Sequence, residues 1–165
     1  MLTETTILTL PLQIRLALRR EEGLAQGRSD AFRFALEYHG DIAQIQSEIE
    51  KFEGYVANPE LLGGAMRPNT TVREHADGYI PALKEVLQIV LQGRSQSASN
   101  GEVANGLLPE QVANRLDFEQ TIASGRSNAF LFAQKCYGHI GVLRAAIQDS
   151  EAFLSESLDK VSSSI

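Results

Sequence analysis

Two copies of the tripeptide Gly-Arg-Ser, at residues 27–29 and 125–127, are the strongest local signal for chemistry in this chain. Backbone N–H groups at a helix start, together with the arginine, can hold a phosphate or a carboxylate. The same residue types also suit a structural role, in which Gly ends one helix, Ser caps the next and Arg pairs with a carboxylate. A nucleotide-binding loop has more glycines than this motif, so we favour the structural role. The candidate ligand-binding residues of the motif are Arg28, Ser29, Arg126 and Ser127.

A carboxylate also recurs on the apolar, core-facing stripe of the first helix in each half of the chain, at Glu21 and at Glu119. A buried carboxylate must be paired with a cation or protonated. The two carboxylates could therefore meet and form an acid/base or cation site. Alternatively, each could pair with one of the arginines, Arg28 or Arg126, or tilt to the surface at the edge of the stripe. We favour these structural roles, because no histidine or second carboxylate recurs with the two glutamates to complete a site.

The three histidines and the single cysteine show no catalytic or metal-binding pattern. None of His39, His75 and His139 has a histidine at the equivalent position of the other half. No two ligands have the i,i+4 spacing of a helical zinc site. Cys136 falls on the apolar seam of a helix with no base at helical spacing, which predicts a buried, inert thiol. We therefore expect no catalytic residue, no metal, no cofactor and no enzyme activity.

These candidates recur because the chain contains an internal duplication. Residues 11–56 align without a gap with residues 109–154, at an offset of 98, and about a third of the aligned positions are identical. The most similar block is Gly-Arg-Ser-Asp-Ala-Phe-Arg-Phe-Ala at 27–35 against Gly-Arg-Ser-Asn-Ala-Phe-Leu-Phe-Ala at 125–133. Two copies are too few for a solenoid, which needs about three or more repeats.

Each repeat has the pattern of a helical hairpin. Its first helix begins at a proline (Pro11 or Pro109) and is expected to end at Gly27 or Gly125. The next residues then supply the N-cap of the second helix, with Asp30 and Asn128 as alternatives to the serines. The second helix carries an a/d seam, which predicts packed antiparallel helices. In the first copy the seam is Ala31, Ala35, Tyr38, Ile42, Ile45, Ile49, Phe52 and Val56, and in the second it is Ala129, Ala133, Cys136, Ile140, Leu143, Ile147, Ser150 and Leu154.

Between the repeats, residues 57–94 form an inserted loop followed by a helix that ends at Gly93, and residues 95–107 have the composition of a flexible linker. The recurrence of Gly40 and Gly138 on the outer side of the seam suggests a kink or a close backbone contact. The sequence therefore predicts one all-α domain over residues 1–165. It is a bundle of about five helices, built from two duplicated antiparallel hairpins related by a pseudo-two-fold axis.

Composition excludes several classes of function. The chain has 165 residues, 43% of them hydrophobic, and its net charge of −6 is spread along the sequence, with −2 over residues 11–56 and −2 over residues 109–157. No segment has the basic surplus that nucleic-acid binding requires, and no apolar run could span a membrane. A single cysteine excludes an intramolecular disulfide framework. The N-terminus resembles an extended segment ending at Pro11 rather than a signal peptide, so we expect a cytoplasmic protein.

The sequence leaves two classes of function open. The first is a non-enzymatic helical protein–protein interaction protein: an adaptor, a chaperone-like protein, an inhibitor or an assembly component. The alternative is a bundle that binds a small ligand or anion through the two Gly-Arg-Ser segments. We expect a protein partner and favour a monomer, since two repeats in one chain could complete the bundle, with a homo-oligomer as the alternative.

Overall fold

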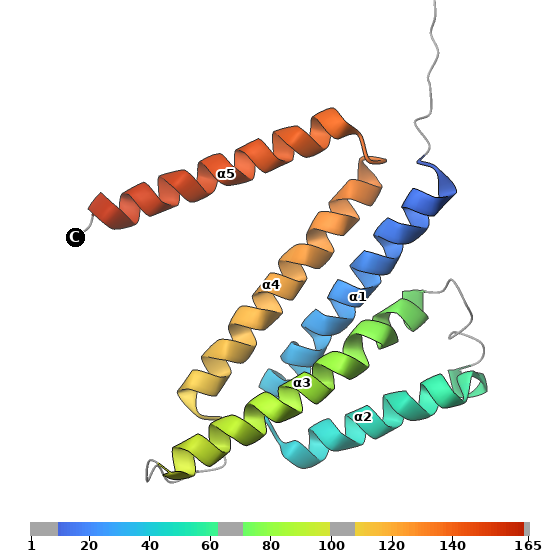
Figure 1. The fold of residues 1–165 in the computed structure, drawn as a ribbon, viewed down its shortest axis with the longest axis vertical. Helices are drawn as coiled ribbons and strands as arrows, with labels where there is room; N and C mark the ends of the chain where they lie inside the picture. Colours follow the sequence, from blue (N-terminus) through green and yellow to red (C-terminus); the bar gives the residue numbers. More distant parts are fainter. Residues whose placement is uncertain (1–9, 63–70, 100–107, 164–165) are drawn as a thin grey trace, which may run out of the picture.

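The described part of the chain is all helical, as the sequence predicts. The computed structural model describes residues 10–62, 71–99 and 108–163, and within these ranges it contains no strand. The segment before Leu10, the loop residues 63–70 and the linker residues 100–107 lie outside the described residues. The elements are α1 (Leu12–Glu37), α2 (Ile42–Ala57), the short 3-10 helix η1 (Pro59–Leu62), α3 (Thr71–Ser99), α4 (Glu110–Lys135) and α5 (Ile140–Ser163) (Figure 1).

The first helix of each repeat does not end where the sequence predicts. It continues through Gly27 to Glu37 in α1, and through Gly125 to Lys135 in α4. The Gly-Arg-Ser segments therefore lie inside helices, and the predicted N-caps at Ser29 and Ser127 are wrong. Asp30 and Asn128 do not start helices either.

Gly27 lies inside α1 because this helix and α3 cross with their backbones in contact. A Cβ at Gly27 would overlap the carbonyl oxygen of His75, and a Cβ at Gly78 would overlap that of Leu24. Only glycine allows two helix backbones to approach this closely. The helix-propensity cost of an interior glycine, about 1 kcal/mol, is therefore offset by the packing of α1 against α3.

The α1–α2 turn lies at Tyr38–Asp41, about ten residues later than expected. The N–H of Gly40 donates to the carbonyl of Ala35, and the N–H of His39 donates to the carbonyl of Leu36. Both His39 and Gly40 have a positive φ. This hydrogen-bond pattern is a Schellman motif, which ends a helix with residues in the left-handed region. Gly40 thus recurs because it forms this turn.

The second repeat makes the same turn at Cys136–His139, with matching hydrogen bonds and positive φ at Tyr137 and Gly138. Cys136 is the half-buried C-cap of α4, so its predicted place in a core seam is wrong. The caps that follow are chemically different. Asp41 accepts from the N–H of Gln44, and His139, 98 residues later, accepts through Nδ1 from the N–H of Val142.

Helix α3 extends further than the pattern predicts, through Gly93 to Ser99. Residues 95–99 of the predicted linker are therefore helical. Gly93 faces α4, and a Cβ there would overlap the side chain of Val112. As at Gly27, a glycine that resembles a helix end permits a close contact between helices.

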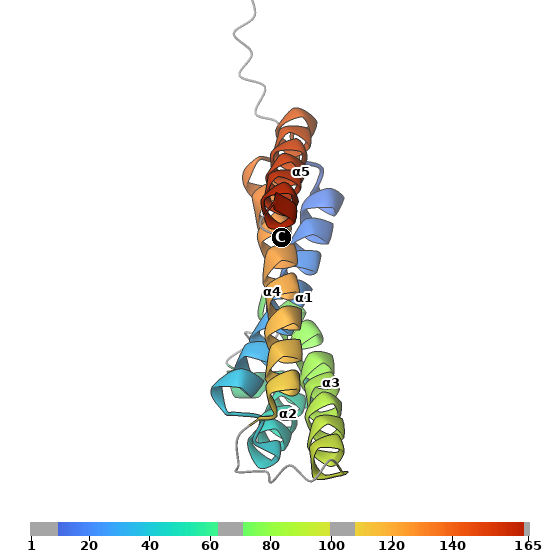
Figure 2. The same ribbon diagram turned by 90° about the vertical axis from the view of Figure 1, so that its left-hand side faces the viewer.

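The hydrophobic core lies around α3, which packs against α1, α2 and the N-terminal part of α4 (Figures 1 and 2). The fully buried larger side chains are Phe32, Ile45, Leu83, Val86, Val90 and Leu116. The predicted seam of α2 is used here, since Ile45 and Ile49 are buried in this core. Helices α1 and α2 diverge from their turn, so α2 packs on α3 rather than along α1.

Helix α5 has no such neighbour. None of its residues is buried, and Figure 1 shows it extending from the turn after α4 with no other helix along it. The pseudo-two-fold arrangement of whole hairpins therefore stays a prediction. None of the helices in the described ranges combines the length and the apolar content that crossing a bilayer would require.

Candidate functional site

The six residues proposed from the sequence all lie at the interface between α1 and α4. These helices run antiparallel (Figure 1), and the ion pairs of the six residues join one helix to the other or to α3. The residues are Glu21, Arg28 and Ser29 on α1, and Glu119, Arg126 and Ser127 on α4. Their contacts are reciprocal. Arg28 pairs with Glu119, and the equivalents of these two residues 98 positions away, Arg126 and Glu21, pair with each other.

Arg28 is the most strongly held of these residues. Its Nη1 lies 2.5 Å from Glu85 Oε2 on α3, its Nη2 lies 3.0 Å from Glu119 Oε2, and its guanidinium covers the ring of Phe32. The hydrogen bond to Glu85, reinforced by Glu119, raises the pKa of Arg28. The same hydrogen bond lowers the pKa of the Glu85 carboxyl, against a smaller opposing effect of burial. Arg28 therefore joins α1, α3 and α4.

Arg126 makes the equivalent contacts with one partner fewer. Its Nη2 lies 3.0 Å from Glu21 Oε2, and its guanidinium covers the ring of Phe130. Among the described residues, no acidic side chain contacts it in the way that Glu85 contacts Arg28. Each glutamate thus pairs with an arginine across the interface, which is one of the two structural roles expected from the sequence. The two carboxylates do not form a joint site.

The two serines are buried in the same interface. Ser29 Oγ accepts from Gln120 Nε2 at 3.1 Å. Ser127 Oγ lies 3.2 Å from a Glu22 carboxylate oxygen and 3.1 Å from Gln26 Oε1, so its single proton can serve one of the two at a time. Each serine hydroxyl therefore forms a hydrogen bond with a side chain of the opposite helix, and both hydroxyls are buried in the interface.

This geometry removes the basis of the predicted anion site. Inside a helix, backbone N–H groups donate to carbonyls one turn earlier and are not available to a phosphate. Both arginines already pair with carboxylates. The Gly-Arg-Ser segments position the α1–α4 interface and do not form ligand-binding turns.

His75 belongs to a second polar cluster, between α1, α2 and α3. Its Nε2 lies 2.8 Å from Asp30 Oδ2, and its ring stacks on Tyr79, whose hydroxyl donates to Glu48 at 3.0 Å. Burial alone would raise the pKa of Asp30, but the hydrogen bond and charge of His75, with Arg33, outweigh it and lower that pKa. No described cluster has three or more His, Cys, Asp or Glu side chains placed to hold a metal ion. The cluster joins three helices.

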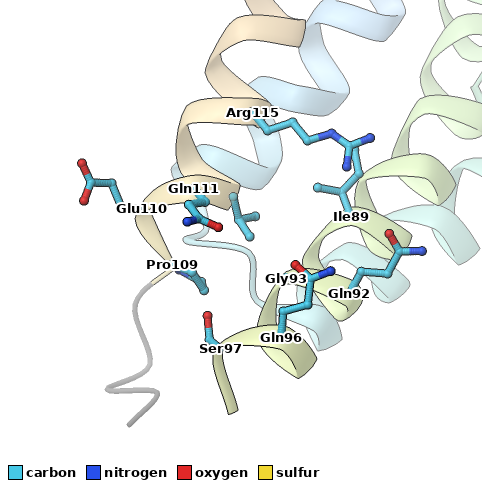
Figure 3. Close-up of a pocket in the computed structure, with 10 residues that line it drawn as sticks. Ile89, Gln92, Gly93, Gln96, Ser97, Pro109, Glu110, Gln111 and Arg115 are labelled. Atoms are coloured by element: carbon cyan, nitrogen blue, oxygen red, sulfur yellow. The ribbon is translucent and has the colours of Figure 1, made fainter. Parts of the chain in front are cut away.

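A pocket of about 370 Å³ lies where the C-terminal part of α3 meets the start of α4 (Figure 3). Its volume suits a small ligand. None of its polar side chains is buried, however, and Glu110 points away from it in Figure 3. The polar groups that line it are Gln92, Gln96, Ser97, Glu110, Gln111 and Arg115. With no buried group to orient a ligand, the pocket is a surface depression.

The largest unexplained feature is an apolar surface on α4 and α5, which we call the α4–α5 face. Six of its large side chains on α5 are at least partly exposed, and five of these are more than half exposed. The face comprises Gly125 and Ala129 on α4 with Ile140, Leu143, Ile147, Leu154, Leu158 and Val161 on α5. A soluble monomer rarely exposes apolar side chains in one contiguous patch of this size.

Four of the equivalent positions in the first repeat, Gly27, Ala31, Ile45 and Ile49, are buried, and Ile42 and Val56 are half-buried. Ile49 is 8% exposed, whereas Ile147 is 56% exposed. Ala31 is fully buried, whereas Ala129 is exposed. Gly27 is in backbone contact with α3, whereas a Cβ at Gly125 would meet nothing within 4 Å. The same sequence positions are therefore core in one repeat and surface in the other.

The cause is that α3 covers only one end of the α1–α4 pair. It buries Val112 near the start of α4, which is 5% exposed, while Ile14 at the same position of α1 is 47% exposed. No described helix lies on the α4–α5 face as α3 lies on α1 and α2.

The sequence predicts an apolar seam covered within the chain, and five residues of this face belong to it: Ala129, Ile140, Leu143, Ile147 and Leu154. Two signals pointed to the difference. Each repeat has an apolar seam that a further helix must cover, but the sequence between the repeats contains only one helical segment of the α3 type. In addition, Phe52, which lies against α3 in the first repeat, is replaced by Ser150 in the second.

Comparisons of the chain with models of known families, with curated proteins and with solved structures found no match.

Proposed function

We propose that this chain is a non-enzymatic protein-interaction protein that binds an amphipathic helix on its α4–α5 face. The observation that carries the proposal is the exposure of Ile147 and its neighbours at positions whose equivalents in the first repeat are covered by α3. Exposed apolar surface of this kind is stabilised by docking an apolar helix face, as in other helix-in-groove interactions.

The first repeat defines what the bound helix should look like. Helix α3 presents a small residue, Gly78, at its closest approach to α1, and apolar side chains such as Leu83 and Val86 further along. It lies parallel to α1 and antiparallel to α2. A helix with small residues near Gly125 and aliphatic side chains near Ile147 would fit the second repeat in the same way.

A peptide of residues 71–99, the α3 sequence itself, is a direct probe of this surface. We expect the labelled peptide to bind the full chain saturably in fluorescence anisotropy. Ile147→Asp should weaken binding at least tenfold, because it places a charge where an apolar contact is needed.

The matched control is Gln148→Asp, which adds the same charge one residue along, on a different side of α5. It should leave peptide binding within about twofold of the original chain, since a surface change outside a contact has little effect. Equal weakening by both variants would overturn the proposal, and so would the absence of saturable binding by a chain that sediments as a monomer.

A further inference from the structure

Helix α5 has 24 residues, none of them buried, and a helix in a protein gains most of its stability from packing its apolar face. The need to cover this face narrows the choice of partner. If the apolar face of α5 must always be packed against another helix, the partner helix should be present whenever the chain is present. A second copy of the same chain meets that condition.

The apolar seam of α5 is complementary to itself in the antiparallel direction. With the centre between Ser150 and Glu151, the seam positions of two copies pair as Ile140 with Val161, Leu143 with Leu158 and Ile147 with Leu154. Each pair then occurs twice, as a two-fold interface requires. The small or polar Ser150 lies next to its own copy at the centre.

The antiparallel direction also agrees with the first repeat. There α3 runs antiparallel to α2 and buries Ile45 and Ile49. The α5 of a second copy would run antiparallel to α5 in the same way and cover Leu143 and Ile147, the equivalents of those residues. It would lie beside Gly125 and Ala129 of α4, where open space remains.

We infer that the chain forms a two-fold symmetric dimer in which the α5 helices of the two copies pair antiparallel across their α4–α5 faces. This inference rests on the proposed function, because it identifies the helix that the face binds. It differs from the monomer favoured from the sequence, because no described helix of the chain completes the second repeat.

Sedimentation of the full chain over a range of concentrations tests the inference. We expect a species of twice the 18.1 kDa chain mass, and Ile147→Asp should shift its dissociation constant upwards at least tenfold. Gln148→Asp, the off-face control, should sediment as the original chain does. A dimer that Ile147→Asp leaves intact would use another surface and would overturn the inference.

Cysteine cross-linking tests the register. In a Cys136→Ser background, Ser150→Cys lies beside its own copy and should form an inter-chain disulfide under mild oxidation. Gln148→Cys, on a different side of the helix, should not. Equal cross-linking at both positions would overturn the antiparallel register.

The outcomes for the inference and for the proposed function can be told apart. If the chain stays monomeric at every concentration but binds the 71–99 peptide, the second copy is the wrong partner and the helix-binding face stands. If the chain is monomeric and binds no peptide, both are wrong.

Discussion

Arg28 donates to the Glu119 carboxylate across the α1–α4 interface at 3.0 Å. The equivalent pair in the other direction, Arg126 with Glu21, has the same separation. The two contacts differ in one respect, since Arg28 also pairs with Glu85 of α3. Comparing the two arginines therefore isolates how much the pairing with Glu85 of α3 contributes to the stability of the interface.

Arg28→Ala should destabilise the chain more than Arg126→Ala does. Both variants lose a cross-interface carboxylate and a ring contact, but Arg28→Ala also leaves Glu85 without its arginine. We expect a loss of about 1 to 2 kcal/mol for Arg28→Ala and less than about 1 kcal/mol for the more exposed Arg126→Ala. Urea unfolding followed by circular dichroism measures both, and equal losses would contradict the asymmetry.

The stability of the chain should fall in acid partly through Glu85. Its pKa is lowered in the folded state by the hydrogen bond from Arg28. A lowered pKa stabilises the fold above the unfolded value of about 4.3, and this stability is lost as the pH falls through the folded pKa. Because the side chain is 41% exposed, the contribution should be below about 1 kcal/mol.

Glu85→Gln isolates that contribution. The variant should be less stable than the original chain near neutral pH, and the difference should shrink towards zero below about pH 4. Unfolding free energies of the variant and the original chain, measured near neutral pH and again below about pH 4, check this. A difference that stays constant with pH would show that the loss comes from packing and not from ionisation.

Tyr79→Phe should cost about 1.5 to 3 kcal/mol, since a buried phenol loses a hydrogen bond to a charged acceptor, Glu48. Burial and the Glu48 carboxylate also raise the pKa of Tyr79 well above its ordinary value. Its phenol should therefore stay protonated when the pH is raised past about 10. An ultraviolet titration should give the same ionisation curve for the variant as for the original chain over that range.

Tyr55→Phe is the control for this measurement, because Tyr55 is half-buried and packs on Phe52 through its ring. We expect its loss to stay within about 0.5 kcal/mol. If both variants lose the same stability, the hydroxyl of Tyr79 contributes nothing specific.

Local patterns were enough to predict the all-α class and to give the pairing of Glu21 and Glu119 with arginines as one of two structural roles. They were not enough to predict the helix ends. Gly27 suits a helix end and a close helix crossing equally well, and only the position of α3, fifty residues away in the chain, decides between them. Gly40, in contrast, lies in the turn itself with φ positive, and a Cβ there would also overlap the side chain of Leu108.

The α4–α5 face could not be predicted for a related reason. A seam of apolar residues shows that a helix face needs a cover but does not show where the cover comes from. Ile49 and Ile147 are the same residue in the same pattern, and their exposures differ because α3 exists once. Counting the segments available to cover each repeat would have found the unpaired face.

The last prediction concerns Gly27 and Gly125, which suit helix ends but lie inside α1 and α4. Gly27→Ala should destabilise the chain by about 1 to 3 kcal/mol, because its Cβ would overlap the backbone of α3 at His75 and force the helices apart. Gly125→Ala meets nothing within 4 Å and should stabilise α4 by up to about 1 kcal/mol, since alanine is the better helix former. Opposite signs for the same substitution at duplicated positions are expected in urea unfolding. Equal destabilisation by both would mean that a helix already lies against Gly125 as closely as α3 lies against Gly27.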